Sequence, residues 1–471
     1  MGVAATTAGA NGEEVEQSLY EVRRKIYPRA VTGWFAGWRW GLVWLTQLVF
    51  YGLPWLVWND RQAVLFDLGA RKFYIFGLVL WPQDFIYLTA LLIIAAYSLF
   101  LFTAIGGRLW CGYACPQTVY TEMFMWVERK VEGNRAARMR LDQAAMGGRK
   151  LALKALKHAI WIAIALWTGF TFVGYFTPIR DLLQQVATVQ LGPWQSFWIL
   201  FYGFATYGNA GWMREQVCKY MCPYARFQSA MFDKDTMIVT YDPARGEPRG
   251  PRARKADARA LGLGDCVDCT MCVQVCPTGI DIRNGLQYEC IGCAACIDAC
   301  DQVMGRMGYP KGLIRYATEN AIKNRWDTRQ MFQRVLRPRT AIYTAILGLI
   351  VAVAGVSLYN RVPLKADLVP DRAAIGRKVD GELENVYRLQ VMNTMEQAHR
   401  YRITVSGLPG LRLDGDAEVE MAPATTRQVP IRLRVPVAQA PTKGSHRIEV
   451  QLEAVDDPSL KVNEKTVFLV R

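Results

Sequence analysis

The sequence predicts a multi-domain membrane protein: an α-helical transmembrane bundle of about five spans, a compact cysteine-rich domain on one side and an all-β domain on the other. Three observations lead to this expectation. Long uncharged apolar runs recur along the 471 residues, most of the 12 cysteines gather in one short stretch, and the final part of the chain alternates apolar with polar side chains.

Five apolar runs lack charged residues, and each approaches the roughly 20 residues that a helix needs to cross a hydrocarbon core. They are residues 40–58, 85–105, 159–177, 194–213 and 341–359. A polar leader precedes the first run, so we expect no cleavable signal peptide. Residues 63–81 are apolar overall but carry Asp67, Arg71 and Lys72, which predicts a hairpin or a half-buried segment at the membrane surface instead of another span.

Lysine and arginine are distributed unevenly between these runs. They are dense before the first run, between the second and third, and between the fourth and fifth, whereas Arg180 alone lies between the third and fourth. This asymmetry predicts a multi-pass protein of a bacterial inner membrane, with a cytoplasmic N-terminus and a periplasmic C-terminus. The net charge of +15 then reflects topology, and nucleic-acid binding is disfavoured. The tract GEPRGPRARKADARA (residues 246–260) has no interleaved aromatics and reads as a solvated linker.

Eight cysteines form two copies of one pattern, CVDCTMCVQVCP at residues 266–277 and CIGCAACIDACD at residues 290–301. This is the ligand spacing of a two-cluster bacterial ferredoxin, in which the fourth cysteine of each copy ligates the other cluster. The spacing assigns one [4Fe–4S] cluster to Cys266, Cys269, Cys272 and Cys300, and the second to Cys276, Cys290, Cys293 and Cys296. Paired zinc sites would not require the third and fourth cysteines at these offsets. Asp301 replaces the proline of the first copy without removing a ligand.

The other four cysteines form two CxxxCP motifs, CGYACP at residues 111–116 and CKYMCP at residues 218–223, each closing an apolar run. Proline is well suited to the first position of a helix, so Cys115 and Cys222 are expected to be N-cap residues whose pKa the helix dipole lowers. If the second and fourth spans are neighbours, the four sulfurs make a soft site. Such a site suits Cu(I), zinc, a third iron–sulfur cluster or a dithiol–disulfide couple; inert interfacial cysteines are the alternative.

Other cofactors are limited by what the sequence lacks. His158, His399 and His446 are its only histidines, which excludes a bis-histidine membrane haem. No GxGxxG follows a predicted strand, so a nucleotide cofactor is not supported. Electrons are therefore expected from a protein or from quinol. Beyond the last span, alternating segments at residues 387–391, 400–405, 429–435, 447–452 and 466–470 predict a small β-sandwich.

The string CPTGIDIRNGLQYECIGCAACIDAC, with two CxxxCP motifs and a β domain after the last span, resembles the cytochrome c oxidase accessory protein family known as CcoG, FixG or RdxA. The resemblance covers nearly the whole chain from about Tyr27 onward. It implies an immunoglobulin-like outer domain and a Cu(II) reductase that supplies Cu(I) for assembly of cbb(3)-type cytochrome c oxidase. The resemblance implies that copper is bound and reduced at Cys111, Cys115, Cys218 and Cys222. It also implies copper transporters, copper chaperones or oxidase assembly factors as partners.

The expected organisation has seven parts. They are a cytoplasmic segment (1–37), transmembrane helices one to four (38–235), a linker (236–264), a ferredoxin-like domain (265–310), a basic juxtamembrane segment (311–339), a fifth transmembrane helix (340–360) and a periplasmic immunoglobulin-like domain (361–471). Cupric reduction is the expected activity. The alternatives are a membrane ferredoxin that relays electrons between quinol and a partner reductase, and a non-catalytic assembly scaffold.

Overall fold

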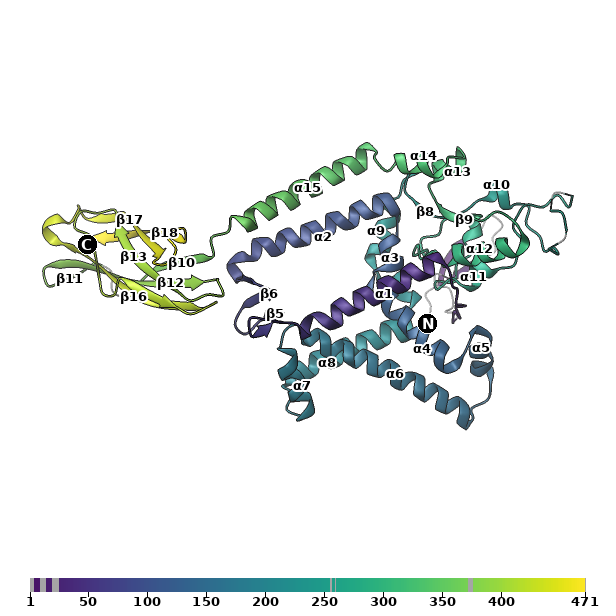
Figure 1. Ribbon diagram of the computed structural model, residues 1–471, viewed down its shortest axis with the longest axis horizontal. Helices are drawn as coiled ribbons and strands as arrows, with labels where there is room; N and C mark the ends of the chain where they lie inside the picture. The colour runs from purple at the N-terminus through teal and green to yellow at the C-terminus, as the bar shows by residue number, and fades with distance from the viewer. Residues whose placement is uncertain are drawn as a thin grey trace. The chain divides into compact units, whose positions relative to one another are not determined.

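The computed structural model describes residues 4–8, 14–18, 25–254, 256–258, 260–371 and 376–470 (Figure 1). The chain divides into two compact units, each built from separated segments. The first unit comprises Met1–Gln47, Leu99–Gly169 and Ile199–Ala341; the second comprises Leu48–Ser98, Phe170–Trp198 and Ile342–Arg471. All 12 cysteines belong to the first unit.

A long helix lies at each of the five predicted apolar runs. These helices are α1 (Trp34–Gly52), α2 (Phe85–Gly106), α6 (Gly148–Val173), α8 (Pro193–Thr206) and α15 (Pro338–Tyr359). Within the described ranges, three are long and apolar enough to cross a membrane: Pro82–Gly106, Gly148–Val173 and Pro338–Tyr359. α1 ends earlier than predicted because Pro54 begins a 3-10 turn (Leu53–Trp55), and α8 gives way to a π-helical turn (Tyr207–Met213).

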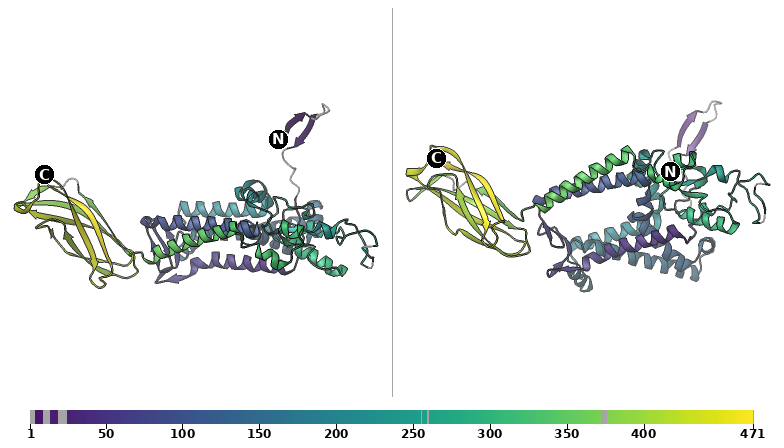
Figure 2. Two further views of the ribbon diagram at one scale, coloured as in Figure 1. Left: turned by 90° about the horizontal axis from the view of Figure 1, so that it is seen from above. Right: turned by 45° about the horizontal axis from the view of Figure 1, so that its top comes forward.

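Helices α2 and α15 run antiparallel to each other. Near one end the Tyr87 hydroxyl donates to the Ser357 carbonyl at 3.1 Å, and near the other the Arg337 guanidinium donates to the Ala104 carbonyl at 2.7 Å. The views in Figure 2 show the two helices side by side. Their exposed apolar side chains, such as Leu92 and Val353, are typical of a lipid-facing surface.

The predicted hairpin at residues 63–81 is present as a three-stranded antiparallel meander. β5 (Val64–Asp67) pairs with β6 (Lys72–Ile75), which pairs with β7 (Leu78–Leu80). Asp67 lies opposite Lys72 at the first turn, so the charges that interrupt the apolar run sit where the chain reverses. A shorter pair, β3 (Val57–Trp58) with β4 (Arg61–Gln62), precedes the meander, and α7 (Ile179–Ala187) also belongs to this unit.

Asp84 fixes the start of the outer β domain. Only 4% exposed, this carboxylate lies 2.7 Å from the Arg361 guanidinium, forms a second ion pair with Lys365, and accepts from the Trp81 amide at 3.0 Å. Because all three partners surround one buried acid, the first strand of that domain is bonded to the residues that introduce α2.

The outer domain is the predicted β-sandwich, and its strands bury alternate side chains. One sheet has the order β10 (Leu364–Pro370), β12 (Glu382–Asn393), β16 (Thr426–Pro436), β14 (Arg412–Asp414), with β11 (Arg377–Val379) also on β12. The other has the order β15 (Glu418–Met421), β13 (His399–Ser406), β17 (Gly444–Ala454), β18 (Lys461–Val470). Both sheets contribute fully buried core residues, including Leu389, Leu433, Val450 and Phe468.

The first unit holds the cysteine-rich segment between two strands. β8 (Ile238–Tyr241) pairs antiparallel with β9 (Ile314–Ala317), and together they cover a core that contains Ile297 and Met304. β8 lies in the segment expected to be a linker. The remaining helices of the unit are α3 (Leu109–Tyr113), α4 (Pro116–Glu132), α5 (Arg135–Gln143), α9 (Pro223–Met231), α10 (Pro243–Gly246), α11 (Met271–Gln274), α12 (Ala295–Met307), α13 (Glu319–Lys323) and α14 (Thr328–Gln333).

A further two-stranded sheet lies near the N-terminus, where β1 (Ala4–Ala8) pairs antiparallel with β2 (Glu14–Ser18).

Candidate metal centre

The eight cysteines of the repeated motif lie close together in the first unit. Cys300, on α12, is repelled electrostatically by Cys266, Cys269 and Cys272, which come from the other copy. Cys296 in turn is repelled by Cys290, Cys293 and Cys276, and also by Cys272. A small cavity is lined by Cys272, Cys276, Cys290, Cys293 and Cys296. The fourth cysteine of the second copy, Cys300, is thus within electrostatic range of the first triplet, and Cys276 is within range of Cys296, as the predicted ligand sets require.

Both copies repeat the same unusual backbone. The residues before and after the second cysteine of each CxxCxxC have positive φ: Asp268 (50°) and Thr270 (54°) in the first copy, Gly292 (67°) and Ala294 (58°) in the second. Left-handed residues next to right-handed ones turn successive N–H groups inward and form the concavities that surround iron–sulfur sites. Thr270 and Ala294 are also the N-caps of α11 and α12. The backbone therefore fits a [4Fe–4S] cluster at each copy.

Burial raises the pKa of Cys272, Cys290 and Cys300 to about 12. A bound metal must displace these thiol protons, so we expect cluster retention to weaken as the pH falls. In the part of the chain that the structure describes, no three His, Cys, Asp or Glu side chains are arranged to hold a single metal ion. A cube of four irons separates its cysteines more widely than a single ion does.

The two CxxxCP motifs adopt matching helix starts. Cys115 is the N-cap of α4 and Cys222 is the N-cap of α9, each followed by proline in the first turn, as predicted. Cys111 lies within α3 and Cys218 within a π-helical turn (Val217–Met221). The four thiols are electrostatic neighbours: Cys111 is influenced by the other three, and Cys218 by Cys115 and Cys222.

The predicted lowering of the pKa is wrong for Cys115, and the pKa values of Cys111 and Cys218 are also raised. Burial, followed by repulsion from Cys115, raises the pKa of Cys111 to about 12, and burial raises the pKa of Cys218 to about 11. The pKa of Cys115 is also raised, because burial outweighs the opposing effect of the Gln117 and Thr118 amides at the start of α4. Desolvation of a thiolate exceeds the stabilisation that one helix terminus provides here.

The first CxxxCP motif packs directly on the second cysteine copy. A Cβ atom at Gly112 would lie 2.9 Å from the backbone N and Cα of Cys293 and 2.9 Å from the Ile291 carbonyl oxygen. Cys111 and Cys218 both pack against the buried cluster that contains Ile291 and Cys293. Glycine is required at this contact because any side chain would separate the two backbones.

Arg108 joins the same elements. Its guanidinium donates to the carbonyls of Tyr288, just before the second copy, and Cys290, its first residue, and to the Ala225 carbonyl in α9. Arg108 is 5% exposed. In the sequence Arg108 is recognisable only as a positive charge three residues before Cys111. Gln228 was missed: its side-chain oxygen lies 3.4 Å from the Cys111 sulfur. A buried glutamine one helical turn beyond a CxxxCP motif was the available signal.

Fold and site together define a class of protein: membrane iron–sulfur proteins in which a ferredoxin-type domain lies beside two CxxxCP thiol pairs. Residues 213–319 match the family described as 4Fe-4S dicluster domain, and residues 87–133 match a 4Fe-4S binding domain. Residues 354–471 match the IG-like fold at the C-terminal of FixG, which confirms the immunoglobulin-like prediction.

Three curated relatives extend these matches to most of the chain. The nitrogen fixation protein FixG of Rhizobium meliloti is 39% identical over 441 residues, covering 86% of this chain and 84% of the relative. RdxA of Cereibacter sphaeroides is 38% identical over 444 residues, covering 92% and 93%. RdxB of the same organism is 40% identical over 422 residues, covering 88% and 87%. This chain belongs to the FixG/RdxA family of iron–sulfur proteins, which confirms the resemblance.

Metal analysis tests the ligand sets. Protein purified without oxygen is expected to contain about eight irons and eight sulfides per chain. Cys300→Ser and Cys276→Ser should each halve the iron content and remove a different EPR signal, because each substitution takes a ligand from a different cluster. About twelve irons in the wild type would contradict this count and place a third cluster at the CxxxCP motifs.

Proposed function

We propose that this protein is a cupric reductase of a bacterial inner membrane, with five spans, a cytoplasmic iron–sulfur domain and a periplasmic immunoglobulin-like domain. The three membrane-length helices and the basic segments that flank them support this arrangement. α1 and α8 supply the other two spans, since each coincides with an uncharged apolar run.

One observation carries the proposal: Gly112, in the first CxxxCP motif, lies against the backbone of Cys293 in the second cysteine copy. Cys111 and Cys218 pack against the same cluster-ligand segment. Redox partners exchange electrons efficiently only when they are close, and this contact leaves no room for an intervening side chain. The eight-cysteine sets would hold two [4Fe–4S] clusters, which supply one-electron chemistry when bound.

The thiols of Cys111, Cys115, Cys218 and Cys222 provide the copper ligands in this proposal, and they would have to draw together around the ion, since no three of them are arranged to hold one in the described part of the chain. Cu(II) displaces thiol protons as it binds, and it becomes Cu(I) by accepting one electron from an external donor. Thiolate sulfur is a soft ligand that favours Cu(I), so the site biases the equilibrium toward the product. Arg108 offsets the negative charge that builds up near Cys111 and Cys218 when the protons leave. The Cu(I) then serves the assembly of a cbb(3)-type cytochrome c oxidase.

Replacing all four CxxxCP cysteines with serine tests this role. Copper reduction by dithionite-reduced protein is expected to disappear, while both cluster EPR signals and the iron content remain, because none of the four belongs to a predicted cluster set. Cu(I) is measured anaerobically with a colorimetric chelator. Reduction at the wild-type rate in the quadruple variant would show that these thiols are not the site.

A relay function is the second candidate, and the match of residues 87–133 to a 4Fe-4S binding domain favours it, since that segment contains Cys111 and Cys115. In a relay the four cysteines would hold a third cluster, and the protein would pass electrons between quinol and a partner reductase. Deleting residues 361–471 distinguishes a reductase from a non-catalytic scaffold. A reductase that lacks these residues should still reduce copper, whereas a scaffold that lacks them should no longer support oxidase assembly.

A further inference from the structure

The first unit contains a cavity of about 490 Å³ whose lining includes none of the 12 cysteines. Its walls come from the N-terminal segment at Lys25, from α4 and α6, and from the π-helical turn Tyr207–Met213. Two tryptophans form apolar walls: Trp161 is 2% exposed and Trp212 is 52% exposed. The α6 residues that line the cavity, Lys154 to Trp161, lead into the apolar part of a membrane-length helix.

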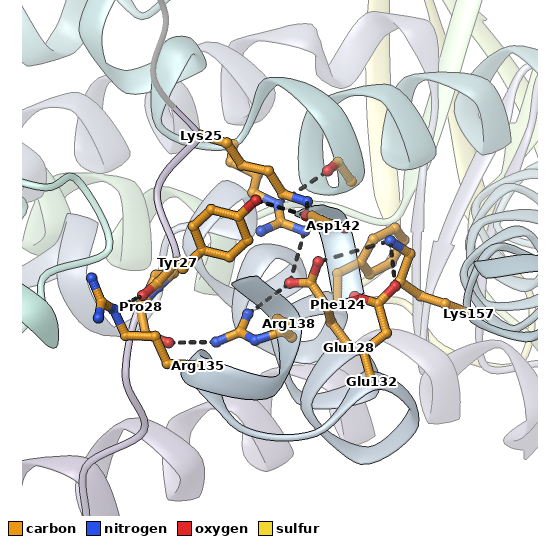
Figure 3. Close-up of polar contacts among 12 residues, drawn as sticks. Lys25, Tyr27, Pro28, Phe124, Glu128, Glu132, Arg135, Arg138, Asp142 and Lys157 are labelled. Carbon is orange, nitrogen blue, oxygen red and sulfur yellow. Dashed lines mark hydrogen bonds and ion pairs between the residues drawn. The ribbon is translucent and has the colours of Figure 1, made fainter. Parts of the chain in front are cut away.

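The charged side chains around the cavity neutralise one another (Figure 3). Asp142 lies 2.6 Å from Lys154 and also binds Lys25, and Glu128 lies 2.9 Å from Arg138 and 3.2 Å from Arg214. A phosphorylated ligand, such as a nucleotide, would have to break these ion pairs to gain a counter-charge. The cavity therefore favours a neutral molecule.

His158 adds a polar group between aromatic rings. Its ring is stacked on Trp212 with centroids 5.7 Å apart and meets Trp161 edge-on at 5.2 Å. Nδ1 lies 3.0 Å from the Tyr207 hydroxyl, which leaves Nε2 as the nitrogen for a ligand. Aromatic walls with one directional hydrogen-bonding group suit a flat ring that carries hydroxyls.

The backbone beside the cavity departs from regular helix on both sides of Arg214. π-helical turns at Tyr207–Met213 and Val217–Met221 flank it, and Arg214 itself has a φ of 42°. Such turns and left-handed non-glycine residues concentrate at functional sites because they cost stability. Gly211 permits the arrangement, since a Cβ atom there would lie 3.2 Å from the Trp161 ring.

The same turn connects the cavity to the metal centre. Arg214 and Glu215 line this cavity, and both also line a smaller one whose other walls include Cys218 and Cys293. A molecule bound against Trp161 is therefore separated from a CxxxCP thiol and a cluster-ligand cysteine by the side chains of two adjacent residues.

We infer that this cavity binds a membrane quinol and that quinol is the electron donor, an inference that rests on the proposed reductase for the fate of the electrons. Two electrons leave the quinol singly and reduce two copper ions: QH₂ + 2 Cu(II) → Q + 2 Cu(I) + 2 H⁺. His158 Nε2 accepts a hydroxyl proton, and Trp161 and Trp212 hold the ring. No nucleotide site is needed for this electron supply.

The experiment measures how fast decylubiquinol reduces the iron–sulfur clusters, followed by the appearance of their EPR signals, anaerobically and without copper. We expect His158→Gln to lower the rate at saturating quinol about a hundredfold, as loss of a proton acceptor does. We expect Trp212→Ala to raise the KM about tenfold, as loss of one stacking wall does. Trp44→Ala, at a tryptophan that is 64% exposed on α1, is the matched control and should behave as wild type. Dithionite should reduce all four proteins equally.

A photoactivated azidoquinone gives a second readout, and its adducts should map to peptides from α6 and from residues 207–215. Wild-type clusters that accept electrons from dithionite but not from decylubiquinol would overturn the inference, as would wild-type kinetics in both cavity variants or adducts confined to other segments. The two proposals can fail separately. If dithionite-reduced protein does not reduce Cu(II), the reductase proposal is wrong. Whether the cavity binds quinol is still tested by quinol-driven reduction of the clusters.

Discussion

Gly112→Ala is expected to abolish most copper reduction and to destabilise the first unit by roughly 1–3 kcal/mol, the usual cost of overpacking a well-filled contact. The added methyl group would sit 2.9 Å from backbone atoms of Ile291 and Cys293, which cannot rotate away as a side chain can. The two backbones must therefore separate, and the thiol pairs move away from the cluster-ligand segment. Thermal unfolding in detergent and anaerobic Cu(I) formation measure the two effects.

Gly305→Ala is the matched control for that substitution. Gly305 also lies in a helix of the first unit, α12, but a Cβ atom there meets nothing within 4 Å. Alanine in an open helical position is expected to raise stability by about 0.5–1 kcal/mol. Equal behaviour of the two variants would mean that the contact with Cys293 does not position the thiols.

Glu128→Gln is expected to cost about 3–5 kcal/mol, the effect of breaking a buried ion pair from one side. Glu128 is 1% exposed and serves Arg138 and Arg214 together, with Lys157 at 3.8 Å, so the neutral amide leaves several cations without their counter-charge. Glu319→Gln, at an exposed helix start in the same unit, should cost less than about 1 kcal/mol. Chemical denaturation at neutral pH makes the comparison.

The destabilisation caused by Glu128→Gln is expected to depend on pH. Burial raises the pKa of Glu128, but the positive charges of Arg214, Arg138 and Lys157 lower it by more than burial raises it. The pKa of Glu128 is therefore below the ordinary glutamate value. A carboxylate whose pKa is lowered by folding stabilises the folded state at pH values above its unfolded-state pKa. That stabilisation is lost as the pH falls through the folded-state pKa. The stability gap between wild type and Glu128→Gln should therefore shrink on acidification. A gap that stayed constant would assign the effect to packing.

The strongest sequence patterns survive in the structure because they reflect local chemistry. The two cysteine copies and the prolines after Cys115 and Cys222 specify backbone turns within a few residues, and the outer strands follow from simple alternation. The prediction of a helix at each apolar run likewise depends only on local sequence. Three of the five reach membrane length and composition. α8 has only 14 residues because the chain continues into a π-helical turn, whereas α1 has 19 residues but includes the polar side chains Arg39 and Gln47.

What the sequence could not give depends on contacts between distant segments. Nothing in CGYACP states that Gly112 faces Cys293, and Arg108 has its hydrogen-bond partners far along the chain. The predicted direction of the Cys115 pKa shift was wrong for the same reason, since helix starts are visible in sequence whereas burial by other segments is not. The pairing of β8 with β9 across the whole cysteine-rich segment was likewise invisible to period-two alternation.

That strand pair has a consequence for how the protein is made. Ribosomes release residues in order from the N-terminus, so β8 emerges well before β9, and the segment between them cannot close until Ala317 is out. By then α2 and α6 have already left the ribosome for the lipid phase. Iron and sulfide delivery therefore has to act on a nascent or newly released chain that is already tethered to the bilayer, which makes cofactor loading a late and membrane-confined event.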